Sequence, residues 1–205
     1  MRIGKQDNAV TSISTSDAAS ITVRGLDLCS EIMGELDFTS YFWLLVTGQK
    51  PSETQRFFAD ATLCAIAEHG LVPSVAAARM TLAAGPEAWQ GAVAAGLLGC
   101  GSVILGSADL AGQFLAATIA RAEADGLSDH DAAVAGIRAL RAEKKAIPGY
   151  GHPQHSEGDP RALRLIALAQ EKGVARRHIA MLHAARDAMP EALGRPLPIN
   201  VNGAI

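Results

Sequence analysis

The sequence has few aromatic residues and few cysteines, and it has no long apolar run and no run of like charges. Aromatic residues make up 4% of the 205 residues, and the three cysteines are Cys29, Cys64 and Cys100. Thiols so few and so widely spaced do not form a disulfide framework and are typical of a reducing compartment. No apolar stretch approaches the roughly 18 residues of a membrane span, and the first residues lack the apolar core of a signal peptide. We therefore expect a cytoplasmic protein that does not enter a membrane.

Charge gives little reason to expect a nucleic-acid partner. The formal net charge is −3, and no basic stripe is present. Hydrophobic residues make up 49% of the chain, and alanine and leucine dominate among them. This composition favours a helical globular protein with a substantial core.

Helix signals recur along the chain. Asp37 is placed to begin a helix and Gly48 to end it, and Ser52 and Gln55 have capping-box spacing at the start of the next. Further helices are expected at 86–101, 110–124, 129–144, 160–172 and 174–189. We see no sustained period-two alternation, so the predicted fold is all-α. Residues 1–20 are expected to form an N-terminal extension, and residues 21–205 a single domain.

The most unusual stretch is Ile147 to Arg161, which contains Gly, Pro, His and Arg between two helical segments. Asp159 followed by Pro160 predicts a helix start, which places Arg161 in the first turn, where the helix dipole and a guanidinium can hold a carboxylate or phosphate. We interpret the stretch as a site. A Pro- and Gly-rich surface loop before a capped helix is the alternative.

The glycines before the histidine support this interpretation. Gly149 and Gly151 allow a tight turn or a close approach to a ligand. His152 is then held on a loop of restricted shape, as a hydrogen-bond donor or proton-transfer group requires.

The motif Pro148-Gly149-Tyr150-Gly151-His152, followed by Asp159-Pro160-Arg161, resembles the signature of the citrate synthase family, which includes citryl-CoA lyase modules. The resemblance implies that His152 contacts the carbonyl or hydroxyl derived from oxaloacetate and that Arg161 holds a carboxylate. It also implies that the backbone of Pro148, Gly149, Tyr150 and Gly151 cradles the adenine of CoA. The implied fold has a large and a small helical subdomain, with residues near 146–175 in the small one, and the implied assembly is a homodimer.

A second stretch, Glu68-His69-Gly70, is similar to the Asp-His-Glu segment of the family. The resemblance implies that His69 and Arg79 bind the substrate carboxylates. Local reasoning alone favours His69 as a histidine at a helix C-terminus, where a cation is favourable, over a ligand, and it fits Arg79 equally well as an ordinary solvated residue.

Two positions depart from the catalytic pattern of the family. Leu105 stands where the family has the histidine that stabilises the enol of acetyl-CoA, and Asn202 stands where it has the aspartate base. Neither side chain can do that work near pH 7. If the protein is an enzyme, His155 and Asp109 are the candidates for proton transfer. The chain also stops before the last helices of the family, and we expect that segment to be missing here.

The resemblance leads to two expectations about function. The first is a citryl-CoA lyase or a citrate synthase-type acyltransferase that takes a citrate- or oxaloacetate-type carboxylate and a CoA thioester as substrates. The second is a homologue that binds these ligands without turnover. We expect no bound cofactor. We also expect no metal site, because His178 and His183 lie five residues apart and do not share a helix face.

Overall fold

The computed structural model describes residues 11–68, 70–101, 106–152 and 154–205. The chain divides into two compact units, Met1–Cys64 and Ala65–Ile205, which are described one at a time. The helices are α1 (Phe38–Thr47), α2 (Glu53–Ile66), α3 (Pro73–Ala84), α4 (Trp89–Leu98), α5 (Ser107–Asp125), α6 (Asp129–Ala142), α7 (Pro160–Glu171), α8 (Arg177–Leu193) and α9 (Val201–Ala204). None of the described helices is long and apolar enough to cross a membrane.

The first unit opens with a small antiparallel sheet of order β1-β2-β3, formed by Ser14–Ser16, Ile21–Val23 and Leu26–Asp27. Its strands are two or three residues long, too short to show alternation in the sequence, which is why we did not expect a sheet. Arg24 and Gly25, with φ of 50° and 84°, form the two-residue turn between β2 and β3. The Arg24 guanidinium donates to the Leu45 carbonyl oxygen at 2.6 and 3.0 Å, so this residue serves the fold. A short π-helical segment, Leu28–Ile32, follows.

The predicted ends of α1 and the predicted start of α2 are confirmed. The Asp37 carboxylate accepts the Ser40 N–H at 2.8 Å, and Gly48 ends α1 with φ of 78°. At the start of α2, the Ser52 N–H donates to Gln55 Oε1 at 2.8 Å and the Gln55 N–H to Ser52 Oγ at 3.2 Å. This reciprocal pair is a capping box.

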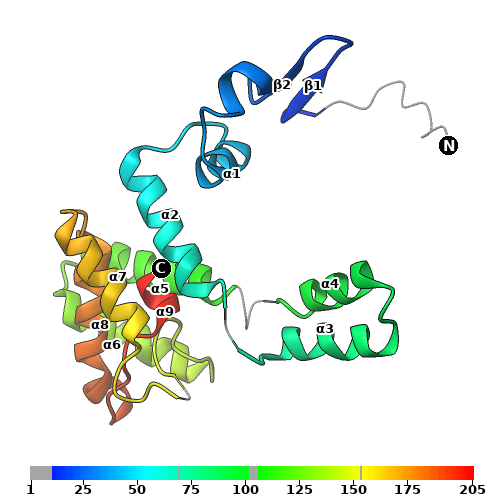
Figure 1. Ribbon diagram of the computed structural model, residues 1–205. Coiled ribbons are helices and arrows are strands. Elements are labelled where there is room, and N and C mark those ends of the chain that lie inside the picture. Colours follow the sequence, from blue (N-terminus) through cyan, green and yellow to red (C-terminus); the bar gives the residue numbers. More distant parts are fainter. Residues whose placement is uncertain (1–10, 69, 102–105, 153) are drawn as a thin grey trace. The chain divides into compact units, whose positions relative to one another are not determined.

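Helices α3 and α4 form a hairpin, visible in green in Figure 1. Small residues let the two backbones approach each other. A Cβ on Gly96 would lie 3.2 Å from the Cβ of Ala78, and one on Gly99 would lie 3.1 Å from the Cα of Ser74. Larger side chains at these positions would separate the helices.

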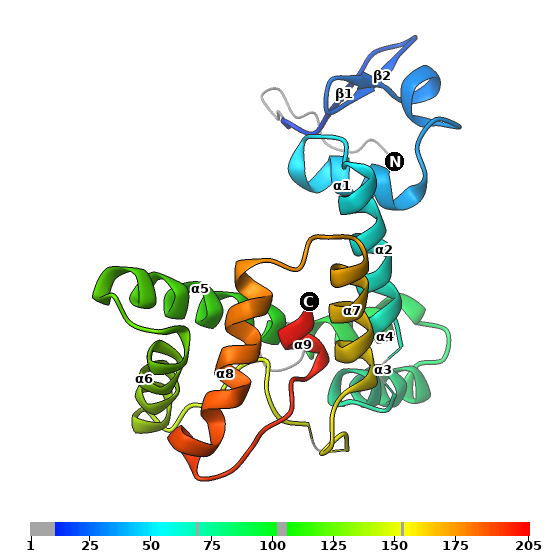
Figure 2. The same cartoon turned by 90° about the vertical axis from the view of Figure 1, so that its left-hand side faces the viewer.

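The remaining helices, α5 to α9, share the main core, and Figure 2 shows α9 between α7 and α8. The core side chains with no exposed surface are Ala132, Ala133, Ile137, Ala162, Met181, Ala185, Ala188 and Met189. The predicted helices of this region are confirmed, although α5 begins earlier than predicted, at Ser107, and α8 ends later, at Leu193. Helix α8 begins at Arg177 and not at Val174, because the N–H groups of Val174 and Ala175 donate to the Ala169 carbonyl oxygen and close α7. Apart from the small sheet, the fold is all-α as predicted.

Candidate functional site

The loop between α6 and α7, which carries the predicted motif, pairs with the segment that leads into α9. Tyr150 forms an antiparallel bridge with Ile199. The Gly151 N–H donates to the Pro198 carbonyl oxygen at 2.8 Å. Asn200 then contacts the loop twice, because its N–H donates to the Gly149 carbonyl oxygen at 3.0 Å and its Nδ2 to the Gly151 carbonyl oxygen at 2.8 Å. Two stretches about fifty residues apart in the sequence therefore form one site.

Gly149 is required because α9 passes close to it. Its φ is +85°, and an added Cβ would lie 2.9 Å from the Cα of Gly203 and 3.2 Å from the Cβ of Ala111. A Cβ on Gly203 would lie 2.5 Å from the Gly149 carbonyl oxygen. Packing thus explains this glycine, and the predicted role of the loop backbone in CoA binding stays a prediction.

The side chain of Tyr150 belongs to the core. Its hydroxyl donates to the Leu182 carbonyl oxygen at 2.8 Å, and its ring packs edge-to-face on Phe114 with 6.5 Å between centroids. Burial raises the pKa of this phenol well above its ordinary value. Tyr150 therefore fixes the loop to α8 and stays protonated in the folded protein.

His152 is held in one orientation by its own loop. Its Nδ1 accepts the backbone N–H groups of Gln154 and His155, each at 3.1 Å. When the ring is neutral and Nδ1 is an acceptor, the ring proton is on Nε2. The His155 ring lies against it, with 4.4 Å between centroids and 35° between planes. In this tautomer His152 carries its donor on Nε2, and the contact to substrate that the motif implies stays a prediction.

Asp159 is the buried centre of the site, with 0% of its side chain exposed. It caps α7 through the Arg161 N–H at 3.0 Å, and it accepts Nε and Nη2 of the same residue at 3.0 and 2.9 Å. It also accepts the Val201 N–H, at the start of α9, at 3.0 Å. Burial on its own raises the pKa of the carboxyl, but the hydrogen bonds from Arg161 and Val201 outweigh it and hold the pKa below its ordinary value.

Arg161 is therefore oriented by a bidentate ion pair, and its side chain is 25% exposed. One edge of the guanidinium, with Nε and Nη2, faces Asp159, and Nη1 lies 3.5 Å from the Ala65 carbonyl oxygen. A fixed guanidinium with an accessible portion suits the predicted contact to a ligand carboxylate. Any such ligand shares Arg161 with Asp159.

The other predicted residues are distributed over three helices. Asn202 lies in the first turn of α9, half-buried, and its amide makes no hydrogen bond to any residue that the structure describes. Asp109 lies in the first turn of α5, exposed, and accepts Gln113 Nε2 at 2.9 Å. Arg79 is exposed on α3. His69 and Leu105 lie outside the described residues.

The structure thus places His152 against His155 on the loop, and Asp159, the partner of Arg161, links the start of α7 to the start of α9, where Asn202 lies. The sequence indicates Asp159 as the cap of a helix. It does not indicate that Asp159 also forms an ion pair with Arg161. An aspartate two residues before an arginine that is proposed as a ligand was the available signal. Among the described residues, no group of three or more His, Cys, Asp or Glu side chains could hold a metal ion.

The fold and the site define a class of protein: a helical fold in which a glycine-rich loop and two helix starts present a histidine donor and a fixed arginine. The chain belongs to the citrate synthase family, since residues 7–204 match the family described as citrate synthase, C-terminal domain. A search of curated proteins found no match.

Solved structures agree with this assignment. Citryl-CoA lyase from Hydrogenobacter thermophilus is similar over 99% of this chain and 74% of that chain, with 29% identity and a TM-score of 0.78. ATP citrate lyase from Methanothrix soehngenii, in complex with citrate and coenzyme A, matches 99% of this chain but only 32% of its own, with 21% identity and a TM-score of 0.77. Citrate synthase from Thermotoga maritima matches 82% of this chain and 44% of its own, with 18% identity and a TM-score of 0.62. The last two likenesses support the fold alone.

Proposed function

We propose that this protein is an enzyme of the citryl-CoA lyase type, which binds a citrate- or oxaloacetate-type carboxylate together with a CoA thioester. The observation that carries the proposal is the pair of fixed groups in the loop: His152, with its Nδ1 occupied by backbone N–H groups, and Arg161, oriented by Asp159. Membership of the citrate synthase family and the likeness to a citryl-CoA lyase support a lyase or acyltransferase. No comparison favours a homologue without turnover.

In the lyase direction, the tertiary hydroxyl of the substrate loses its proton and becomes a carbonyl as the adjacent carbon–carbon bond breaks. The electron pair of that bond stays on the methylene carbon of the thioester, which then accepts one proton. In our proposal, Arg161 holds a carboxylate and the Nε2–H of His152 donates to the reacting oxygen. His155, whose ring lies against His152, is our first candidate for moving the proton, and Asp109 is the second. CoA is a substrate in this scheme and not a bound cofactor.

Asn202 has a different role in the proposal from the aspartate of the family pattern. A carboxamide is a poor base, so it cannot remove a methyl proton near pH 7. Its amide is half-buried at the start of α9 and has no hydrogen-bond partner among the described residues, so we assign it to orienting the thioester. The proton at the methyl carbon must therefore be moved by another group, and by microscopic reversibility the same group serves in cleavage and in condensation.

A homodimer in the cytoplasm is part of the proposal. Large apolar side chains are exposed on the α3–α4 hairpin, including Met80 (74%), Trp89 (73%) and Leu98 (89%). Exposed apolar groups of this kind commonly mark a surface that another chain covers. All three cysteines are free, which suits a reducing compartment. Light scattering during size-exclusion chromatography tests the dimer, and a monomer at micromolar concentration would refute it.

The test of function separates the two roles of His152. In His152→Asn the side-chain oxygen can still accept the N–H groups of Gln154 and His155, as in an Asx turn, but the Nε2 donor is lost. We expect cleavage of citryl-CoA to fall about a hundredfold or more, the usual loss on removing one preorganised donor, while the thermal stability changes little. His178→Asn, which changes an exposed histidine on α8, is the matched control.

Ligand binding is measured in parallel by calorimetry with citrate, oxaloacetate and CoA. Arg161→Lys is preferable to Arg161→Ala, because removing the cation leaves the Asp159 carboxylate buried and uncompensated and confuses binding with folding. We expect Arg161→Lys to weaken citrate binding at least tenfold. If the unmodified chain neither binds citrate nor turns over citryl-CoA, the proposal fails. Binding without turnover in either direction would leave the non-catalytic alternative.

A further inference from the structure

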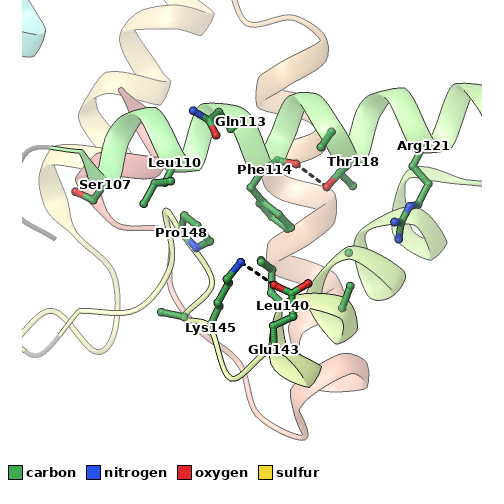
Figure 3. Close-up of a pocket in the computed structure, with 14 residues that line it drawn as sticks. Ser107, Leu110, Gln113, Phe114, Thr118, Arg121, Leu140, Glu143, Lys145 and Pro148 are labelled. Atoms are coloured by element: carbon green, nitrogen blue, oxygen red, sulfur yellow. Dashed lines mark hydrogen bonds and ion pairs between the residues drawn. The ribbon is translucent and has the colours of Figure 1, made fainter. Parts of the chain in front are cut away.

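A cavity of about 720 Å³ lies between α5, α6 and the segment 143–148 (Figure 3). Its lining on α5 runs from Ser107 to Arg121, a length of about 21 Å at about 1.5 Å of rise per residue. None of His152, His155 and Arg161 lines it. The cavity is therefore elongated, and Pro148 is the lining residue that also belongs to the loop backbone predicted to bind CoA.

The interior of the cavity is apolar. Side chains of Leu110 and Phe114 on α5 face Leu140 on α6, and Pro148 closes one end. The Thr118 hydroxyl is already bonded to the Phe114 carbonyl oxygen at 2.7 Å and offers no donor to a ligand. An apolar chain without polar atoms along its length would match these walls.

The space owes its shape in part to Gly136 on α6. A Cβ at this position would lie 3.3 Å both from Cε2 of Phe114 and from Oγ1 of Thr118. The glycine lets α5 and α6 approach closely at this point, and the lining residues spread from there towards both ends of the cavity.

Most polar groups at the rim are neutralised or bonded within the chain. Lys145 Nζ pairs with Glu143 Oε2 at 2.7 Å, and Gln113 Nε2 donates to Asp109 at 2.9 Å. Arg121 is different, because its guanidinium has no hydrogen bond or ion pair with any residue in the described part of the chain. Figure 3 shows it at the end of the row opposite Ser107. The cavity thus combines an apolar body with one unneutralised cation at one end.

We propose that this cavity binds an elongated aliphatic carboxylate, with the carboxylate at Arg121 and the chain between α5 and α6 in the direction of Pro148. The ligand needs only one carboxylate, because Glu143 already neutralises the charge of Lys145. The cavity has the size of a small-molecule site, and its length along α5 suits a chain better than a compact ring. This site goes beyond the proposed function. A CoA thioester of the same chain has no free carboxylate, so decanoyl-CoA is tested beside decanoate to show whether the carboxylate at Arg121 is needed for binding.

The experiment is isothermal titration of the full chain with decanoate, decanoyl-CoA and CoA. Arg121→Gln removes the partner of the head group, and Ala139→Phe fills the cavity from an exposed position on α6, where a larger side chain need not disturb the core. Arg141→Gln, on an exposed arginine of α6 outside the cavity, is the matched control for charge. We expect decanoate to bind to the unmodified chain, each cavity variant to weaken it at least tenfold, and the control to leave it unchanged.

Four results would overturn the proposal, and the first three are no binding of decanoate, binding that both cavity variants leave intact, and complete displacement of decanoate by CoA alone. The third result would make the cavity part of a CoA site. Tighter binding of decanoyl-CoA than of decanoate, insensitive to Arg121→Gln, would also overturn it, because the head group would then lie elsewhere. His152→Asn separates the two proposals, since it should lower citryl-CoA cleavage about a hundredfold or more and leave decanoate binding unchanged.

Discussion

The carboxylate of Asp159 and the guanidinium of Arg161 form a two-point ion pair, with Oδ1 3.0 Å from Nε and Oδ2 2.9 Å from Nη2. The same carboxylate accepts the N–H of Val201. One buried anion therefore serves the starts of both α7 and α9. The orientation of Arg161, which we propose as a ligand for substrate, depends on it.

Asp159→Asn should destabilise the protein by about 3 kcal/mol, because it removes a buried charge that is hydrogen-bonded to a cation and leaves that cation without its counter-charge. The carboxamide can still cap α7, so the loss isolates the ion pair from the cap. Urea unfolding followed by circular dichroism measures it. Asp109→Asn, on an exposed carboxylate that accepts only Gln113, is the control and should cost under about 0.5 kcal/mol. Equal effects of the two variants would contradict this account of Asp159.

The acid stability of the protein should also depend on Asp159. Its pKa in the folded state lies below its ordinary value of 3.8, so at pH values between the two the unfolded chain binds a proton that the folded chain does not. The contribution of Asp159 to the free energy of unfolding should therefore be fully present above about pH 4. It should be lost as the pH drops through the pKa of Asp159 in the folded state. Urea titrations at a series of pH values should show a shallower fall in Asp159→Asn than in the unmodified chain. Parallel curves would assign the acid sensitivity to other groups.

Much of this fold was predictable because its signals are local. Asp37, Gly48 and Ser52 each act through backbone groups within four residues, and each lies where the sequence rules put it. The family motif likewise gave His152 and Arg161 without a structure. The small sheet of the first unit gave no such signal, because two or three residues cannot establish a period.

The contacts between distant segments were not predictable from local signals. Gly149 was assigned to a ligand approach, whereas Gly203, over fifty residues later, also requires it. Asp159 was assigned to a cap, whereas its contact with Val201 arises only once α9 packs beside α7. The α5–α6 cavity depends in the same way on the distance between two helices. Tertiary packing decides such features, and a single sequence does not reveal it.

Gly203→Ala should destabilise the protein by about 2 kcal/mol or more, because its Cβ would lie 2.5 Å from the Gly149 carbonyl oxygen and neither backbone can move freely. Gly112→Ala, in the interior of α5 with nothing within 4 Å of an added Cβ, is the matched control. That control should stabilise the protein by about 0.5–1 kcal/mol, the usual gain from alanine over glycine in a helix. Thermal unfolding of both variants gives the comparison. A Gly203→Ala protein as stable as the parent would mean that α9 does not approach the loop so closely.

Tyr150→Phe should cost about 1 kcal/mol, the usual net value of one buried hydrogen bond, because the Leu182 carbonyl oxygen loses its donor while the ring contact with Phe114 is kept. Tyr41→Phe provides a matched control, since the hydroxyl of the chain's other tyrosine makes no hydrogen bond to a described residue. We expect that control to change the free energy of unfolding by under about 0.5 kcal/mol. Tyr150→Leu should lose about 1 kcal/mol more than Tyr150→Phe, because the edge-to-face pair disappears as well. If Tyr150→Phe and Tyr41→Phe had the same stability, the hydroxyl would not tie the loop to α8, and the orientation of His152 would rest on the loop's own hydrogen bonds alone.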